Sequence, residues 1–161
     1  MAPPRLADSS IGAAINALIN GAIAWFGFKD SAAVPLSVDS IGSPGVTALG
    51  NAASMTFALV LIKTCITFFV FRSGVRKSAD APVALREMQF LPTGLRIAVA
   101  NTLLAFGAFV TLAVIWQRVM GTVEVAPLVA TVVVALVAAL ATAFAELRTK
   151  TEVLVLARAS R

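Results

Sequence analysis

Four long apolar segments dominate the sequence and decide what the chain can fold into. They cover residues 11–28, 46–71, 97–116 and 125–145, and Lys63 is the only charged residue inside any of them. At about 1.5 Å per residue, even residues 11–28 span about 27 Å as a helix, against a membrane hydrocarbon core of roughly 30 Å. We predict an all-α bundle of four transmembrane helices, forming a single membrane domain over residues 1–161.

The composition supports a membrane location. Hydrophobic residues make up 59% of the chain and charged residues only 13%, whereas an average soluble domain is about a quarter charged. So few charges cannot cover the surface of a soluble globule of this size. Most of the exterior must therefore face lipid, and the bilayer is the first predicted partner.

Several function classes are poorly supported by the side chains present. The chain has no His, and its single Cys is Cys65, so neither a His/Cys metal cluster nor an intrachain disulfide is available. No paired carboxylates, phosphate-binding Gly loop or activated Ser is evident, so we expect neither an enzyme nor a cofactor. The net charge of +5 is spread between the apolar segments rather than gathered into a patch, which argues against nucleic-acid binding.

The basic residues predict the orientation of the helices. Ten Lys and Arg residues fall on one side of the predicted membrane and only Lys29 and Arg118 on the other. The ten are Arg5, Arg72, Arg76, Lys77, Arg86, Arg96, Arg148, Lys150, Arg158 and Arg161. The positive-inside rule then places both termini, the loop 72–96 and the basic tail 146–161 in the cytoplasm. Trp25 and Trp116 fall at the outer boundary, where aromatic belts are typical.

The N-terminal helix has an alternative interpretation as a signal peptide. Arg5, the apolar run and the small residues at 31–33 match the pattern of a cleavable segment, whose removal would leave three helices. The run is long for such a segment and carries Asn16 and Asn20 in its middle, which favours a retained helix.

Two connecting loops carry their own patterns. In the outer loop, residues 29–45, apolar residues alternate around Pro35, which is typical of a partly ordered surface connection or of a lid over the outer mouth. In the inner loop, apolar residues within 84–91 share one helical face, which predicts a short interfacial helix on the cytoplasmic surface. The basic residues Arg72, Arg76 and Lys77 are then placed among lipid headgroups, either as specific contacts or as ordinary topology-setting charges.

Lys63 is the most informative polar residue. It lies eight residues before Phe71, about 12 Å inside its helix, and a lysine near the membrane centre costs about 2.5 to 3.5 kcal/mol. Asn16 and Asn20 lie at similar depth and offer amide oxygens to its ammonium group. Glu146 is the only carboxylate close enough in depth to form an ion pair with it.

These residues define a predicted polar seam in the inner half of the bundle, with two competing roles. Its members are Lys63, Asn16, Asn20, Asn101, Thr67, Thr142 and Glu146. In one interpretation the polar groups hold helices together, each bond contributing about 0.6 kcal/mol, and Lys63 extends toward the headgroups. In the other they bind an anion or line a polar pathway.

Small residues spaced by four predict close helix packing. One set, Ala13, Ala17 and Gly21, lies in the first apolar segment, and a second set, Ala135, Ala139 and Ala143, lies in the last. Four closely packed helices enclose little space. A transport role therefore predicts a homo-oligomer or a partner membrane subunit.

Short motifs suggest a family resemblance over the first half of the chain. They are Ile19-Asn20-Gly21 with Trp25, Val34-Pro35-Leu36 with Ile41-Gly42, and Ile66-Thr67-Phe68-Phe69 before Arg72. In these the chain resembles small four-helix bacterial inner-membrane proteins labelled permease-like. The resemblance implies a bacterial plasma membrane location and no particular substrate.

The sequence leaves two functions open. The first is an oligomeric permease or channel subunit that uses the seam around Lys63. The alternative is a non-transporting accessory or scaffold protein in which the seam only holds the helices together.

Overall fold

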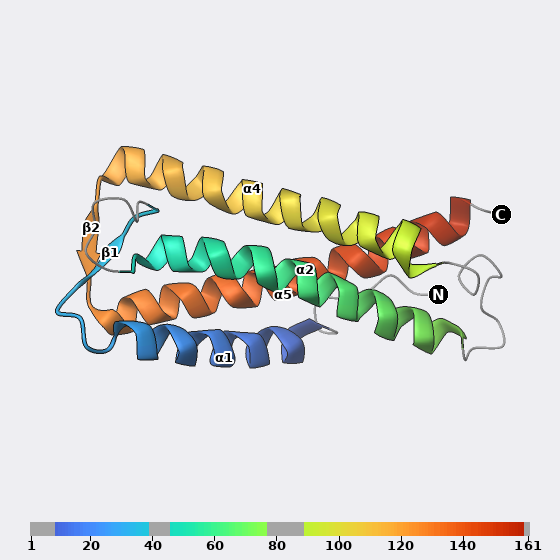
Figure 1. Cartoon of the computed structure of the whole chain (residues 1–161), viewed down its shortest axis with the longest axis horizontal. Coiled ribbons are helices and arrows are strands. Elements are labelled where there is room, and N and C mark those ends of the chain that lie inside the picture. Colours follow the sequence, from blue (N-terminus) through green and yellow to red (C-terminus); the bar gives the residue numbers. More distant parts are fainter. Residues whose placement is uncertain (1–8, 39–45, 77–88, 160–161) are drawn as a thin grey trace.

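Four long helices form the described part of the chain. The computed structural model describes residues 9–38, 46–76 and 89–159. Its long helices run up and down along one axis (Figure 1). They are α1 (Ser10–Phe28), α2 (Ala48–Arg76), α4 (Leu95–Met120) and α5 (Pro127–Ala159). Each is long and apolar enough to cross a membrane, so the prediction of an all-α, multi-pass membrane protein is confirmed at that level.

Helix α5 lies at the centre of the arrangement. It packs along both α1 and α2, while α4 packs mainly against α2 and touches α5 less extensively. The chain reverses direction at each helix, so α1 begins at the end of the bundle where α5 finishes (Figure 1). We call this end the charged end and the opposite one the hairpin end.

Two short strands tie the loops together at the hairpin end. Strand β1 (Val34–Leu36) pairs antiparallel with β2 (Val123–Val125), with Pro35 opposite Glu124. The alternating apolar residues around Pro35 therefore form one strand of a two-stranded sheet. Its partner strand was not predicted, because three residues so distant along the chain carry no recognisable pattern of their own.

The helix ends follow local backbone chemistry. Helix α4 ends at Met120 because Gly121 adopts a φ of 71°, a left-handed conformation that favours glycine, and its N–H donates to the Gln117 carbonyl at 2.9 Å. Helix α5 begins with Pro127, where a missing N–H costs no helical bond. A π-helical turn, η2 (Phe90–Gly94), leads directly into α4.

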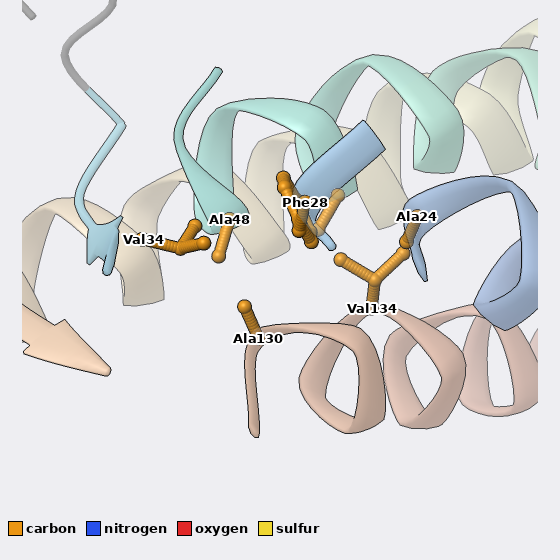
Figure 2. Packing of buried hydrophobic residues seen from close by; sticks show 7 residues of the cluster. Ala24, Phe28, Val34, Ala48, Ala130 and Val134 are labelled. Atoms are coloured by element: carbon orange, nitrogen blue, oxygen red, sulfur yellow. The ribbon is translucent and has the colours of Figure 1, made fainter. Parts of the chain in front are cut away.

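A compact apolar core lies at the hairpin end. Figure 2 shows side chains from α1, α2, α5 and β1 converging there, with Phe28 among much smaller neighbours. The buried members are Ala24, Phe28, Val34, Ala48, Ala52, Ala130 and Val134. Most are Ala or Val, so the helix backbones approach one another closely.

Large apolar side chains cover the outside of the bundle. Leu18 and Val119 are each 75% exposed, and Leu140 is 71% exposed. A soluble protein rarely shows so much contiguous apolar surface, whereas lipid-facing helices require it.

Three of the helices extend several residues beyond a predicted end, and one of them is α4, which reaches Met120 rather than residue 116. Helix α2 runs to Arg76 rather than to Phe71, and α5 continues through the predicted tail as far as Ala159. The extension of α5 is amphipathic: Val153 and Leu154 are buried, while charged residues pair at a spacing of four. Most of the interfacial helix predicted at 84–91 lies outside the described residues.

Candidate functional site at the charged end

The predicted pair of Lys63 and Glu146 forms. Lys63 on α2 places its Nζ 3.2 Å from Oε2 of Glu146 on α5. The two side chains are 20% and 12% exposed, so water reaches the pair only in part. Because Lys63 has a carboxylate partner, the cost of placing its charge in the bundle is offset.

Glu146 also binds a second lysine. Its Oε1 accepts a hydrogen bond from Lys150 Nζ at 2.7 Å, one helical turn further along α5. Lys150 is 18% exposed. We call Lys63, Glu146 and Lys150 the Glu146 hub, which has one negative and two positive groups.

The first turn of α1 closes over the hub. A Cβ atom added to Gly12 would lie 3.2 Å from Lys63 Nζ and 3.4 Å from Glu146 Oε2. With glycine at this position, α1 approaches the ion pair closely. The carboxylate of Glu146 is also favourably placed, because the amino end of a helix carries a partial positive charge.

The contact between Gly12 and the hub indicates how deep in the membrane the hub lies. Helix α1 has 19 residues, which span about 28 Å, close to the roughly 30 Å of a hydrocarbon core. A group beside its first turn therefore lies near the edge of that core when α1 crosses the membrane. The ammonium of Lys63 is closer to the boundary than the position of its Cα along α2 indicates.

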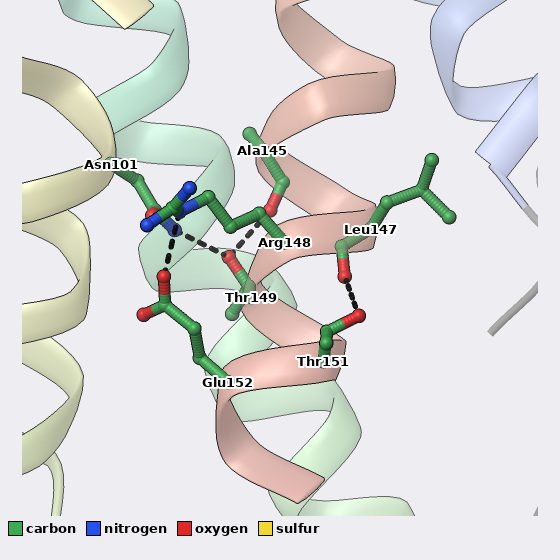
Figure 3. A network of polar contacts seen from close by, with 7 residues as sticks. All are labelled: Asn101, Ala145, Leu147, Arg148, Thr149, Thr151 and Glu152. Atoms are coloured by element: carbon green, nitrogen blue, oxygen red, sulfur yellow. Dashed lines mark hydrogen bonds and ion pairs between the residues drawn. The ribbon is translucent and has the colours of Figure 1, made fainter. Parts of the chain in front are cut away.

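A second polar cluster joins α4 to the other side of α5 (Figure 3). The fully buried Asn101 accepts a hydrogen bond from Arg148 Nε at 2.8 Å and donates to Thr149 Oγ1 at 3.3 Å. Arg148 also contacts Glu152 Oε1 at 2.7 Å. We call Asn101, Arg148, Thr149 and Glu152 the Asn101 cluster.

The two asparagines of α1 do not form the contacts with Lys63 that the sequence predicted. We expected their amide oxygens to accept from Lys63. Instead, Asn20 Nδ2 donates to the Asn16 backbone carbonyl at 2.9 Å, and Lys63 has Glu146 as its ionic partner. A carboxylate carries a full negative charge, so it outcompetes an amide for an ammonium group.

The predicted threonines are buried, and several of the buried hydroxyls bond within their own helices. Thr67 is 6% exposed and Thr142 is fully buried. Thr142 donates to the Ala138 carbonyl, and Thr56 and Thr102 bond in the same way to the carbonyl four residues earlier. Thr64 is an exception, because its buried hydroxyl has no partner among the described residues.

Sequence reasoning missed the part played by the end of α5. Lys150, Arg148 and Glu152 were assigned to a basic tail, although their spacing carried a signal. Glu146 with Lys150, and Arg148 with Glu152, are each separated by four residues, which is typical of charged pairs on a continuing helix.

The predicted headgroup residues are only partly described. Arg72 is half-buried, and its Nε atom has no hydrogen-bond partner among the described residues. Arg76 ends α2, and Lys77 lies outside the described residues.

At the opposite, hairpin end, a half-open cavity of about 350 Å³ is lined by Val38, Val114, Gln117 and Arg118.

The geometry at the charged end ties helices together. The hub joins α1, α2 and α5, while the Asn101 cluster joins α4 to α5. In each cluster, positive groups contact a carboxylate. Comparison with known protein families, curated proteins and solved structures finds no match for this chain.

Proposed function

We propose that this protein is a non-transporting accessory or scaffold protein of the membrane. The observation that carries the proposal is the engagement of Lys63 by Glu146 at 3.2 Å, with Gly12 packed over both groups. A residue of a transport pathway must face a polar passage that crosses the bundle. Here the charge of Lys63 stabilises the contact between helices.

Helix packing supports the same conclusion. A Cβ added to Gly21 of α1 would lie 3.1 Å from the Cβ of Ala135 on α5. The predicted small-residue faces therefore meet each other within one chain at this point, and two backbones this close leave no room for a solute between them.

The proposed location is a bacterial plasma membrane, with both termini and residues 72–96 in the cytoplasm. The distribution of Lys and Arg supports this orientation through the positive-inside rule. Trp25 and Trp116 are 39% and 42% exposed near the carboxyl ends of α1 and α4, which suits an interfacial belt on the outer side.

Reconstitution into lipid vesicles tests the proposal. We expect chloride and potassium fluxes in vesicles with the wild-type chain to equal those in empty vesicles. Lys63→Met should leave both fluxes and assembly unchanged, because Glu146 keeps Lys150 as its partner. Lys29→Met, at the hairpin end, is the control for the loss of one positive charge.

The result that contradicts the proposal is equally specific. A chloride flux in the wild type that Lys63→Met abolishes, with assembly and Lys29→Met unaffected, would establish a pathway through the hub. Native mass spectrometry in lipid discs adds a second criterion, since an accessory protein should be recovered with another membrane protein rather than as a closed homo-oligomeric ring.

A permease or channel subunit is the second candidate, and one observation favours it. The Thr64 hydroxyl is fully buried without a partner among the described residues. An unsatisfied polar group inside a membrane bundle is costly unless water, an ion or a second conformation satisfies it. Thr64→Val should stabilise a scaffold protein, whereas in a channel it should reduce flux.

A further inference from the structure

We propose that the Glu146 hub binds the phosphate group of an anionic phospholipid at the membrane boundary. Lys150 and Lys63 are the donors, and the apolar surface of α1 receives an acyl chain. This inference goes beyond the proposed scaffold role and does not depend on it.

The charges of the hub are not balanced. Among the described residues, two ammonium groups share one carboxylate, which leaves one net positive charge. Near the edge of the hydrocarbon core the dielectric screening is weaker than in water, so an uncompensated charge is costly there. An anion beside the two lysines would offset this cost.

The lysines retain the capacity to bind another group. Each ammonium has three N–H donors, and Glu146 accepts one contact from each of Lys63 and Lys150. Both side chains are about one-fifth exposed, at 20% and 18%. A phosphate oxygen approaching from outside can therefore accept from them without displacing Glu146.

The described helices extend past the hub to different lengths. Among the described residues, α1 begins beside the hub, while α5 continues beyond it to Ala159. Figure 1 shows the start of α1 falling well short of the end of α5. The hub thus lies at a step between a short helix and a long one.

The surroundings favour a lipid over free phosphate. Ile11, next to Gly12, is 74% exposed, and Ile15 on the following turn is 51% exposed. An acyl chain attached to a phosphate at the hub can cover this apolar surface, and its burial would add to the binding free energy. Free phosphate gains nothing from these side chains.

The Asn101 cluster is a weaker candidate for the same ligand. Its single positive group, Arg148, contacts both Asn101 and the carboxylate of Glu152. Of these two clusters, only the hub therefore has more positive than negative groups, and it lies on the α1 side of α5.

Lipid titration followed by native mass spectrometry tests the inference. The full chain is titrated in mild detergent with phosphatidylglycerol and, separately, with phosphatidylcholine. One lysine near a headgroup contributes about 1 kcal/mol, so Lys150→Gln should weaken phosphatidylglycerol binding about fivefold. Lys29→Gln removes the same charge at the hairpin end and should leave binding unchanged.

A second variant makes the test independent of any loss of fold in Lys150→Gln. Glu146→Gln removes the negative group and should tighten phosphatidylglycerol binding several-fold in the folded fraction. The inference is overturned by equal effects of Lys150→Gln and Lys29→Gln, or by equal binding of the two lipids. It is also overturned if millimolar inorganic phosphate displaces phosphatidylglycerol, since that would identify a free-phosphate site.

Discussion

Glu146 differs from its two lysine partners in what its removal leaves behind. When one lysine is removed, the carboxylate of Glu146 keeps the other lysine as a positive partner. Without Glu146, two ammonium groups remain close together with no negative group between them. Removing one member of a buried charged group costs most when the remaining charges lose their compensation.

This asymmetry gives the first stability prediction. We expect Glu146→Leu to lower the free energy of unfolding by roughly 3 kcal/mol, and Lys63→Met to change it by less than about 1 kcal/mol. Thermal unfolding in one detergent, followed by circular dichroism, compares the two variants. Equal losses for both would show that the hub is no more than a pair between Lys63 and Glu146.

Asn101 gives a second prediction at the residue scale. Its side chain is fully buried and bonds both Arg148 and Thr149. Asn101→Ala should destabilise the protein by about 1 to 3 kcal/mol, because buried polar partners lose their bonds. The matched control in the same unfolding assay is Asn51→Ala, because Asn51 on α2 is only half-buried. If Asn101→Ala lowers the free energy of unfolding no more than the control does, the Asn101 cluster does not stabilise the protein.

Among the elements, α5 contacts different helices with different faces. Ala135 and Glu146 meet α1, while Arg148 and Thr149 meet Asn101 on α4. The assignments follow the helical period, since residues three or four apart share a face. The end of α5 is therefore part of the bundle and not a separate tail.

The contact between α1 and α5 gives a prediction at the element scale. A Cβ at Gly21 would lie 3.1 Å from the Ala135 Cβ, whereas nothing lies within 4 Å of one at Gly27. Gly21→Leu should force the two helices apart and cost about 1 to 3 kcal/mol. Gly27→Leu should be neutral or stabilising, by up to about 1 kcal/mol. Equal destabilisation by both, measured by thermal unfolding, would contradict this packing.

At the scale of the whole molecule, β1 and β2 link the two loops of the hairpin end. Their pairing holds the connection between α1 and α2 against the one between α4 and α5. Val38 N–H also donates to Gln117 Oε1 at 2.9 Å, which adds a bond from this connection to the end of α4. The hairpin end is thus restrained by backbone pairing, and the charged end by side-chain charges.

The arrangement of the ends predicts a labelling pattern in intact cells. In a Cys65→Ala background, Lys29→Cys and Glu124→Cys at the hairpin end should react with a membrane-impermeant maleimide added outside. Thr151→Cys, near the end of α5, should react only after the membrane is opened, because the proposed orientation has that end in the cytoplasm. Outside labelling of Thr151→Cys alone would reverse the orientation, and labelling of all three would contradict the membrane-spanning arrangement.

The four apolar helices could be predicted from the sequence alone, because hydrophobic length is a local property that does not depend on neighbouring helices. The sequence also indicated the pairing of Lys63 with Glu146, because Glu146 is the only carboxylate predicted at a suitable depth and a buried charge requires compensation. Both inferences depend on composition and on position along a single helix.

Which helices are neighbours could not be predicted from the sequence and is known from the folded chain. The packing of α1 on α5 brings Gly12 to Glu146, and the hairpin end pairs β1 with β2, although these segments are far apart in sequence. Such contacts depend on how small and large side chains fit across several helices at once. For the same reason, the sequence placed Lys150 and Arg148 in a tail, while in the folded chain Arg148 bonds Asn101 on α4 and Lys150 contacts Glu146 within α5.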